Sequence, residues 1–157
     1  MSLNLDLNAS LKPLNEWYCD HCGKIIKAPE EGWLEWYRDI LGKHDQSNGK
    51  GFRIVHHKNE CMYNSRQMFE ENKLTADMYL IDFTGPDGLV YLLSFIEHER
   101  VENNAELIEI IRRIHVPYYE EARRYHNKAE GDGYFDGENE ITRYIESTSK
   151  HILRQYK

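Results

Sequence analysis

Two short clusters of cysteine and histidine constrain this chain more than any other feature. The first is Cys19-x-x-Cys22, and the second, some thirty residues later, is the pair His56-His57 followed by Cys61. Together they contain all three cysteines of the chain. Three thiolates and one imidazole are a standard tetrahedral ligand set for structural zinc. The sequence therefore predicts that both clusters close on one structural Zn²⁺ ion.

The spacing within the first cluster suits a metal knuckle. Two thiolates separated by two residues can face one ion if the backbone turns tightly, and Gly23 allows the positive φ that such a turn needs. A redox pair of Cys19 and Cys22 is the alternative. It is disfavoured because such a pair precedes a long helix, whereas Gly23-Lys24 followed by Pro29 begins a helix poorly.

The second cluster offers two neighbouring histidines for one position. Successive residues of a strand point to opposite faces, so only one of His56 and His57 should bind the metal. His56 shares a strand face with Phe52 and Ile54, which favours it, and both histidines remain candidates. His21, inside the first knuckle, is expected to point outward.

The cysteine count and the chain's hydropathy predict a compartment. No apolar run approaches the ~18 residues of a membrane-spanning helix. The N-terminus lacks the basic and long apolar regions of a secretory signal. Three cysteines, an odd number, then favour reduced thiols in the cytoplasm. No membrane partner is expected.

Alternating apolar residues predict a small antiparallel β module over residues 4–73. We expect an extended N-terminal arm at 4–16, a hairpin from 17–19 and 24–27, strands at 33–38 and 52–56, and a loop at 42–51. Residues 64–73 fit a short helix or a linker. Residues 78–83 fit a strand or an irregular packed segment.

Helical periodicity replaces this alternation over residues 74–157. Leu89, Leu92, Leu93 and Ile96 have the spacing of one helix face, with a helix start near Thr84. Further helices are expected from 103 or 104 to 114, from 118 to 129, and from about 139 to 156. The predicted fold class is thus α+β, with a zinc-ribbon-like β module followed by a bundle of about four helices.

The β module resembles zinc-ribbon and treble-clef domains. The resemblance covers residues 15–64 and depends on the cysteines, one of the two histidines, and Gly23. It implies a bound metal. Its functional implication is broad, because such modules bind DNA, RNA or proteins, or only stabilise a fold.

A nuclease is a weaker alternative. His56-His57 with Asn59 is similar to the histidine pair of HNH-type nucleases, which also have a treble-clef fold. In those enzymes the Cys-x-x-Cys pair follows the histidines, whereas here it precedes them. In addition, no histidine or asparagine stands where the third metal ligand of those enzymes is expected. Phosphate loops, nucleophile elbows and paired carboxylates are also missing from the sequence, so an enzyme is not favoured.

Two residue groups suggest binding surfaces, each with an ordinary structural alternative. The arginines of the second half could bind phosphate or an acidic partner, or could form a solvated face paired with glutamates. They are Arg112, Arg113, Arg123 and Arg124. Aromatic residues of the first half, interleaved with lysine and arginine, could stack on bases or could form the core. They are Trp17, Trp33, Trp36, Tyr37 and Phe52.

Charge favours a protein partner. The net charge is −7, with 10 basic and 11 acidic residues over 1–73 and 10 against 16 over 74–157. An acidic surface repels nucleic-acid phosphates. The sequence therefore predicts a non-enzymatic, zinc-stabilised binding or regulatory protein whose partner is a protein, with nucleic acid as the alternative.

Overall fold

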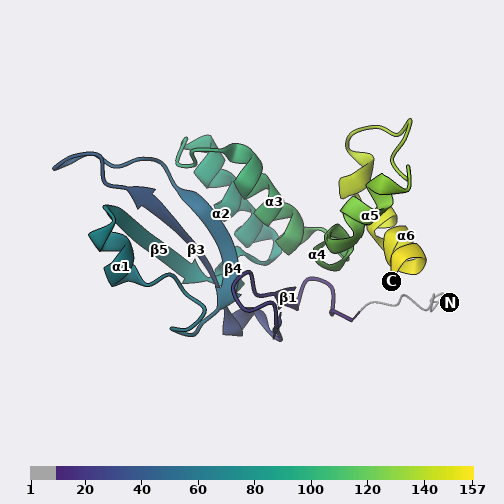
Figure 1. The fold of residues 1–157 in the computed structure, drawn as a ribbon, viewed down its shortest axis with the longest axis horizontal. Coiled ribbons are helices and arrows are strands. Elements are labelled where there is room, and N and C mark those ends of the chain that lie inside the picture. Colours follow the sequence, from purple (N-terminus) through teal and green to yellow (C-terminus); the bar gives the residue numbers. More distant parts are fainter. Residues whose placement is uncertain (1–9) are drawn as a thin grey trace.

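The computed structural model describes residues 10–157 and combines small antiparallel sheets in the first half with helices in the second (Figure 1). Much of the expected N-terminal arm, including Leu5 and Leu7, lies outside the described residues. Within them, Leu11 is buried and Leu14 is exposed. No described helix is long and apolar enough to cross a membrane.

Five strands and six α-helices make up the described chain, joined by turns of 3₁₀-helix. The strands are β1 (Trp17–Tyr18), β2 (Ile25–Ile26), β3 (Gly32–Asp39), β4 (Lys50–His56) and β5 (Lys73–Tyr79). The helices are α1 (Ser65–Glu70), α2 (Gly85–Glu97), α3 (Asn104–His115), α4 (Tyr119–Ala122), α5 (His126–Gly131) and α6 (Glu146–Tyr156). Single 3₁₀ turns occupy Pro29–Glu31, Leu80–Phe83, Arg123–Tyr125 and Thr142–Tyr144.

The main sheet has the order β4-β3-β5 and is antiparallel throughout, while β1 and β2 form a separate hairpin. Side-chain alternation gives the main sheet two different faces. Leu34 and Ile54 lie fully buried on the face that α2 and α3 cover. Glu35 lies on the other face, opposite Arg53 of β4 and Asp77 of β5. The sheet therefore contributes one face to the core and carries polar groups on the other.

Strand β5 resolves the ambiguous region after the second cluster. Residues 65–70 form the short helix α1, residues 73–79 form β5, and residues 80–83 form a 3₁₀ turn rather than a strand. β5 pairs with β3 along its whole length and crosses the expected boundary at 73/74. Its alternation of Leu74, Ala76 and Met78 with polar residues is a strand pattern that was missed.

Helices α2 and α3 form where periodicity predicted them, but Leu93 of the expected apolar face of α2 is exposed. Asn103 caps α3 by accepting a hydrogen bond from the amide of Ala105. α2 has Pro86 in its first turn, but Thr84 does not cap it and donates its hydroxyl hydrogen to the carbonyl of Ile81 instead. Both helices pack against the sheet.

The predictions for the remaining helices were wrong in their bounds. The helix expected at 118–129 is divided into α4, a 3₁₀ turn and α5, and the last helix begins at Glu146 rather than near 139. Glu120 and Glu121 of α4 are buried by distant partners, which apolar periodicity does not encode. Ile141 and Ile145, which fall within the helix expected from about 139 to 156 but precede α6, are exposed.

Two separate apolar clusters follow from this arrangement. The larger one joins the main sheet, α2, α3 and the buried Trp17. The smaller one contains Ala122, Ile152 and Leu153, with tyrosines packed around them. Helices α4 to α6 thus have a small core of their own, at the end of the molecule away from the sheet (Figure 1).

Candidate metal centre

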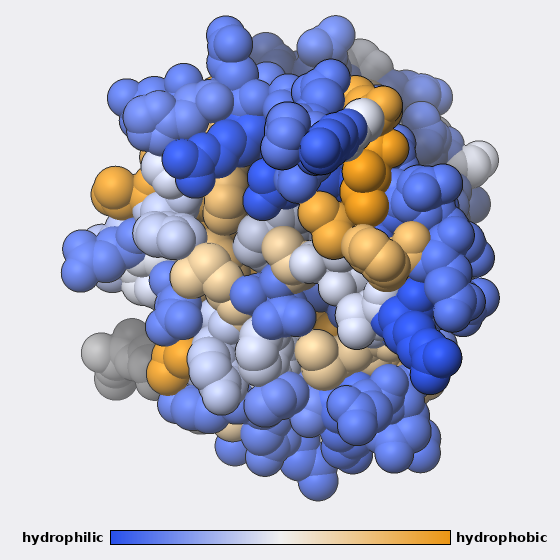
Figure 2. All heavy atoms as spheres, turned by 90° about the vertical axis from the view of Figure 1, so that its left-hand side faces the viewer, coloured by the Kyte–Doolittle hydropathy of each residue, from blue (hydrophilic) through white to orange (hydrophobic). Residues whose placement is uncertain are grey.

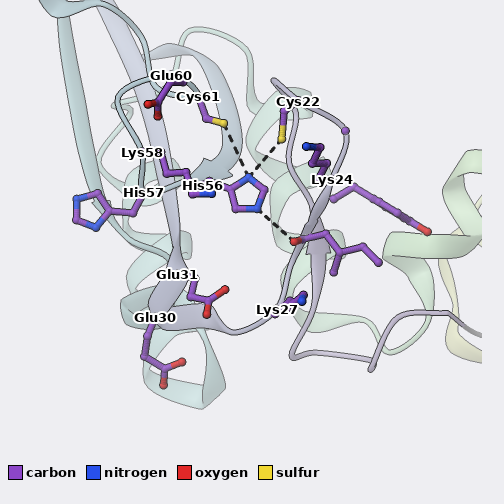
Figure 3. Close-up of a pocket in the computed structure, with 13 residues that line it drawn as sticks. Cys22, Lys24, Lys27, Glu30, Glu31, His56, His57, Lys58, Glu60 and Cys61 are labelled. Carbon is purple, nitrogen blue, oxygen red and sulfur yellow. Dashed lines mark hydrogen bonds between the residues drawn. The ribbon is translucent and has the colours of Figure 1, made fainter.

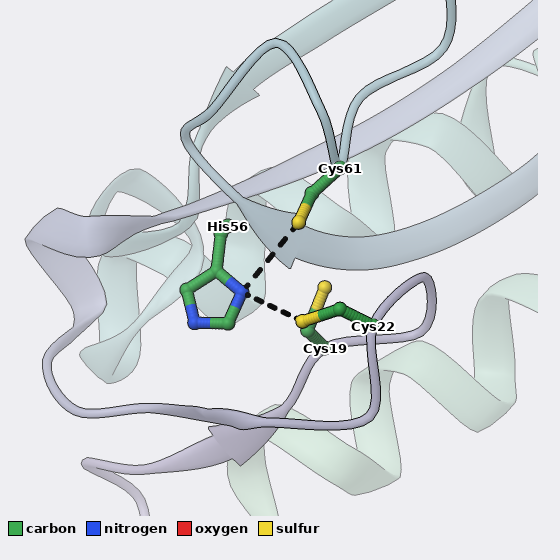
Figure 4. Close-up of side chains that lie close together, drawn as sticks. All are labelled: Cys19, Cys22, His56 and Cys61. Atoms are coloured by element: carbon green, nitrogen blue, oxygen red, sulfur yellow. Dashed lines mark hydrogen bonds between the residues drawn. The ribbon is translucent and has the colours of Figure 1, made fainter.

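Four side chains from both predicted clusters meet at one point (Figure 4). Cys19 and Cys22 follow β1, His56 ends β4, and Cys61 lies in the turn after β4. One potential ligand atom of each residue lies within 4.8 Å of those of the other three. The Nδ1 atom of His56 is 3.4 Å from the sulfur of Cys22 and 3.9 Å from that of Cys61. This Cys3His group is compact enough to hold one metal ion.

The first knuckle has the backbone geometry that its glycine predicted. Gly23 has a φ of +74°, a conformation that favours glycine. Its amide donates to the carbonyl of Cys19 at 2.9 Å, and the amide of Cys19 donates to the carbonyl of Lys24 at 2.9 Å. Because β1 and β2 pair on either side, the hairpin fixes both thiols on one side of the turn.

The second half of the site is a tight turn after β4. The amide of Lys58 donates to the carbonyl of His56, and the amide of Cys61 donates to the carbonyl of Lys58 at 3.0 Å. These bonds fold the chain back within five residues. Cys61 therefore returns to the same face of the sheet as His56.

A hydrogen bond fixes the ring of His56. Its Nε2 atom lies 3.2 Å from the carbonyl oxygen of Ile25. A carbonyl only accepts, so this bond requires the hydrogen on Nε2 and leaves the lone pair of Nδ1 facing the thiols. Metal-binding histidines are commonly oriented by such an outer hydrogen bond.

The neighbouring histidines lie outside the cluster. His57 is exposed, and its ring packs against Trp33, with ring centroids 4.5 Å apart, and against Tyr79 at 5.6 Å. Figure 3 shows the rings of His56 and His57 pointing in opposite directions. His21 is exposed as well. The alternation argument that favoured His56 agrees with this arrangement.

The thiols of this site differ in acidity. Burial, together with the nearby Cys22 and Cys19, raises the pKa of Cys61 to about 12. Burial also raises the pKa of Cys19, but hydrogen bonds from the amides of Cys22, His56 and His21 outweigh it and bring the value to about 6. Without a metal, the site therefore favours a thiolate at Cys19 and a neutral thiol at Cys61. A divalent cation would remove the repulsion between the thiolates and take up all three.

Asp20 joins the first knuckle to the rest of the protein. Its carboxylate accepts hydrogen bonds from the amide of Ile54 and from Arg113, both at 2.8 Å. Its own amide donates to the carbonyl of Ile54 at 2.8 Å. A residue between the two cysteines thus contacts both β4 and α3. Sequence reasoning missed this role, although a carboxylate inside a knuckle was a visible signal.

Arg113 is the centre of a buried ion-pair network. Its side chain is 4% exposed and donates to both carboxylate oxygens of Glu120, at 2.7 and 3.0 Å. Burial lowers the pKa of Arg113, but Glu120 and Asp20 outweigh burial and raise it. Glu120 also accepts from the amide of Tyr18. The guanidinium therefore links β1, the first knuckle, α3 and α4.

This network corrects the interpretation of the arginines as one exposed face. Arg113 is buried, and Arg123 pairs with Glu120. The guanidinium of Arg112 lies over the ring of Tyr144, and that of Arg124 lies over Tyr18. The four arginines are engaged in contacts within the chain.

The aromatic residues of the first half belong mainly to the core. Trp17, Trp36 and Phe52 are buried, so the core interpretation, and not the base-stacking one, holds for these three residues. Trp33 and Tyr37 remain half-buried on the opposite sheet face.

Searches of protein-family models, curated proteins and solved structures found no match for this chain.

Proposed function

We propose that this protein is a non-enzymatic, zinc-stabilised binding or regulatory protein of the reduced cytoplasm. One observation carries the proposal: the potential ligand atoms of Cys19, Cys22, His56 and Cys61 all lie within 4.8 Å of one another, close enough to hold one ion. Four protein ligands complete the tetrahedral coordination of a zinc ion and leave no open coordination position for a substrate. A metal bound in this way stabilises structure. The β1–β2 hairpin and the turn after β4 then form a zinc-ribbon-like module.

The surroundings of the cluster support a structural role. A groove of about 1140 Å³ passes the exposed thiol of Cys22. Its walls carry both Lys24, Lys27 and Lys58 and Glu30, Glu31 and Glu60 (Figure 3). Because lysines and glutamates line the same groove, its electrostatic potential has no single sign that would attract a charged substrate.

A protein is the partner that the surface supports best. The net charge of −7 disfavours nucleic acid, and the arginines of the helical half are used in internal contacts. Val90 and Leu93 on α2 expose 66% and 47% of their surface. Figure 2 shows hydrophobic side chains gathered in small patches among hydrophilic ones on the face it displays. Val90 and Leu93 are the apolar side chains that α2 offers to such a partner.

The two neighbouring histidines provide a matched test of the metal site. We expect one zinc per chain in the purified protein, little zinc in His56→Ala, and one zinc in His57→Ala, because only His56 faces the thiols. Metal analysis by mass spectrometry measures all three, and Cys61→Ser should behave like His56→Ala. Full zinc content in His56→Ala, or zinc loss in His57→Ala alone, would contradict the proposed ligand set.

A gel-retardation assay at two salt concentrations tests the choice of partner. We expect no shift of DNA or RNA even at low salt, because phosphate binding requires a basic surface. A salt-sensitive shift would favour the nucleic-acid alternative.

A further inference from the structure

A second cavity lies at the end of β3 opposite the metal centre. It has a volume of about 510 Å³, within the usual range of small-molecule pockets. The sheet contributes Trp36 and Arg38, α2 contributes Tyr91 and Phe95, and Arg100 follows α2. We call this cavity the Trp36 pocket. It shares no residue with the metal-side groove.

The apolar walls of the Trp36 pocket are formed by packed aromatic rings. Trp36 and Phe95 are 7% and 8% exposed, and their rings meet edge to face with centroids 5.5 Å apart. Trp36 also stacks on Phe52, and Phe95 contacts Tyr91 edge to face at 5.7 Å. Each ring is held by a neighbour, so the walls are formed before any ligand arrives. Such walls suit a flat, apolar ligand.

Two arginines give the pocket its charge. Within residues 10–157, neither Arg38 nor Arg100 has a carboxylate within 4 Å, whereas Arg53 and Arg113 are both paired. None of the described residues that line the pocket is acidic. The chain has a net charge of −7, so the positive charge of this pocket is opposite in sign to that of the whole protein. The guanidinium group matches the geometry of carboxylate and phosphate, which it binds through paired hydrogen bonds.

The rim that carries Arg100 is anchored by backbone bonds. The amide of Arg100 donates to the carbonyl of Phe95, and its carbonyl accepts from the amide of Gly49, both at 2.8 Å. A β-carbon at Gly49 would lie 3.0 Å from the ring of Trp36 and 3.3 Å from the carbonyl oxygen of Arg100. The glycine therefore allows the β3–β4 loop to close tightly against the pocket. The end of α2, the β3–β4 loop and the ring of Trp36 on β3 together fix the position of the rim.

We propose that the Trp36 pocket binds a small molecule with a planar aromatic ring and one anionic group, a carboxylate or a phosphate. The ring lies against Trp36, Tyr91 and Phe95. The anionic group is bound between Arg38 and Arg100. This site is separate from the metal centre and adds a small-molecule ligand to a protein whose proposed partner is a protein.

Calorimetric titration of the zinc-loaded protein tests this proposal at low ionic strength. The anionic probes are indole-3-carboxylate and adenosine 5′-monophosphate, and their neutral counterparts are indole and adenosine. We expect at least one anionic probe to bind tenfold or more tightly than its neutral counterpart. The tighter of the two anions identifies the group as carboxylate or phosphate. Failure of both anions to bind, or equal binding of the neutral compounds, overturns the proposal.

Variants locate the binding site. Arg38→Gln and Arg100→Gln should each weaken the anionic probe about tenfold, as expected for loss of a charge-assisted contact. Arg66→Gln, on a side chain that is 91% exposed on α1, should leave binding unchanged. Affinity retained in the Arg38→Gln/Arg100→Gln double variant contradicts the assignment.

Amide and indole NMR signals of the wild-type protein provide a test that needs no variant. The indole signal of Trp36 should shift on titration, while the signal of Trp17, fully buried beside α3, should not. Shifts confined to residues outside the pocket overturn the proposal.

Discussion

At the scale of single residues, the face of β4 to which a histidine side chain points decides whether it can join the metal site. His56 continues the buried face of Phe52 and Ile54 and is turned by the carbonyl of Ile25 toward the thiols. His57, one residue later, lies on the opposite face against Trp33. Identical side chains therefore have different surroundings because strand residues alternate.

Glu120 is a residue on which the buried network depends. Replacing it with Gln leaves Arg113 with one carboxylate partner, Asp20, instead of two. Breaking a buried ion pair typically costs about 3–5 kcal/mol, so we expect Glu120→Gln to lower the free energy of unfolding by about 3 kcal/mol. Urea denaturation measures this change. Exposed Glu140→Gln is the control and should change it by less than about 0.5 kcal/mol. Equal stability of Glu120→Gln and the wild type would show that the network is dispensable.

His126 should make stability depend on pH. Burial lowers its pKa, Arg143 and Arg123 lower it further, and Glu109 and Glu130 partly oppose them. The folded state therefore resists protonation more than the unfolded chain, whose histidine pKa is 6.5. The contribution of neutral His126 to the free energy of unfolding is fully present above pH 6.5. It is lost as the pH falls through 6.5 toward the lower folded-state pKa.

The variant His126→Phe isolates this effect. The ring contacts Tyr119 and Phe135 edge to face, so phenylalanine can keep the packing without the charge. We expect His126→Phe to lose less stability than the wild type between about pH 7 and pH 5, with zinc present throughout. Denaturation midpoints across this range measure it, with exposed His44→Gln as the control that keeps the wild-type slope. Parallel curves for wild type and His126→Phe would refute the assignment.

At the scale of elements, short segments do much of the positioning. β1 and β2 have only two residues each, yet their pairing holds both knuckle cysteines. Backbone and side-chain bonds from Asp20 then attach this hairpin to β4. A hairpin whose strands have only two residues each is not stable alone. The bonds from Asp20 and the bound metal must therefore stabilise it.

The packing of α2 on the preceding turn depends on Gly88. A β-carbon at this position would lie 2.1 Å from the carbonyl carbon of Phe83, and a backbone atom cannot rotate away. We expect Gly88→Ala to lower the free energy of unfolding by about 1–3 kcal/mol, as overpacking does. Gly42→Ala is the matched control, because nothing lies within 4 Å of its added methyl group. Thermal or urea denaturation compares them, and equal stability of both variants would contradict this packing.

At the scale of the whole molecule, the metal centre and the C-terminal helices are connected through Arg113. The knuckle residue Asp20 binds the guanidinium, which in turn binds Glu120 on α4. Among the described elements, α4 contacts α3 and β1, which lie next to the metal centre and the main sheet. Loss of metal should therefore affect regions well beyond its ligands.

Metal removal tests this connection. A structural zinc site contributes folding free energy on the order of 10 kcal/mol, so a strong chelator should raise amide hydrogen exchange in β1, β2 and the turn after β4. We expect exchange to rise also at the α3–α4 junction, including Glu120. Exchange measured by mass spectrometry reports both regions.

Asp20→Asn separates the connection from the metal itself. This variant keeps all four ligands and removes a charged partner of Arg113. We expect unchanged zinc content with faster exchange at the α3–α4 junction. Protection of that junction that is insensitive both to chelation and to Asp20→Asn would disprove the coupling.

The sequence by itself determined the elements whose information is local. Periodic apolar residues predicted α2, α3, β3 and β4, and the cysteine spacing with Gly23 predicted a knuckle. Alternation along β4 favoured His56 over His57. These features depend on neighbours within a few residues, and short-range spacing encodes them.

Only the tertiary structure decided how the parts are joined. Glu120 and Arg113 look like surface charges in the sequence, because Asp20 and the amide of Tyr18, which help to bury them, lie far away along the chain. In α4, the carboxylates of Glu120 and Glu121 likewise accept hydrogen bonds from the amides of Tyr18 and Leu11, more than 100 residues earlier in the chain. The sequence predicted that Cys19 and Cys61 converge, but only the structure shows that the bonds between Asp20 and Ile54 bring the first knuckle against β4. Contacts between distant residues arise from packing, and local pattern contains little information about them.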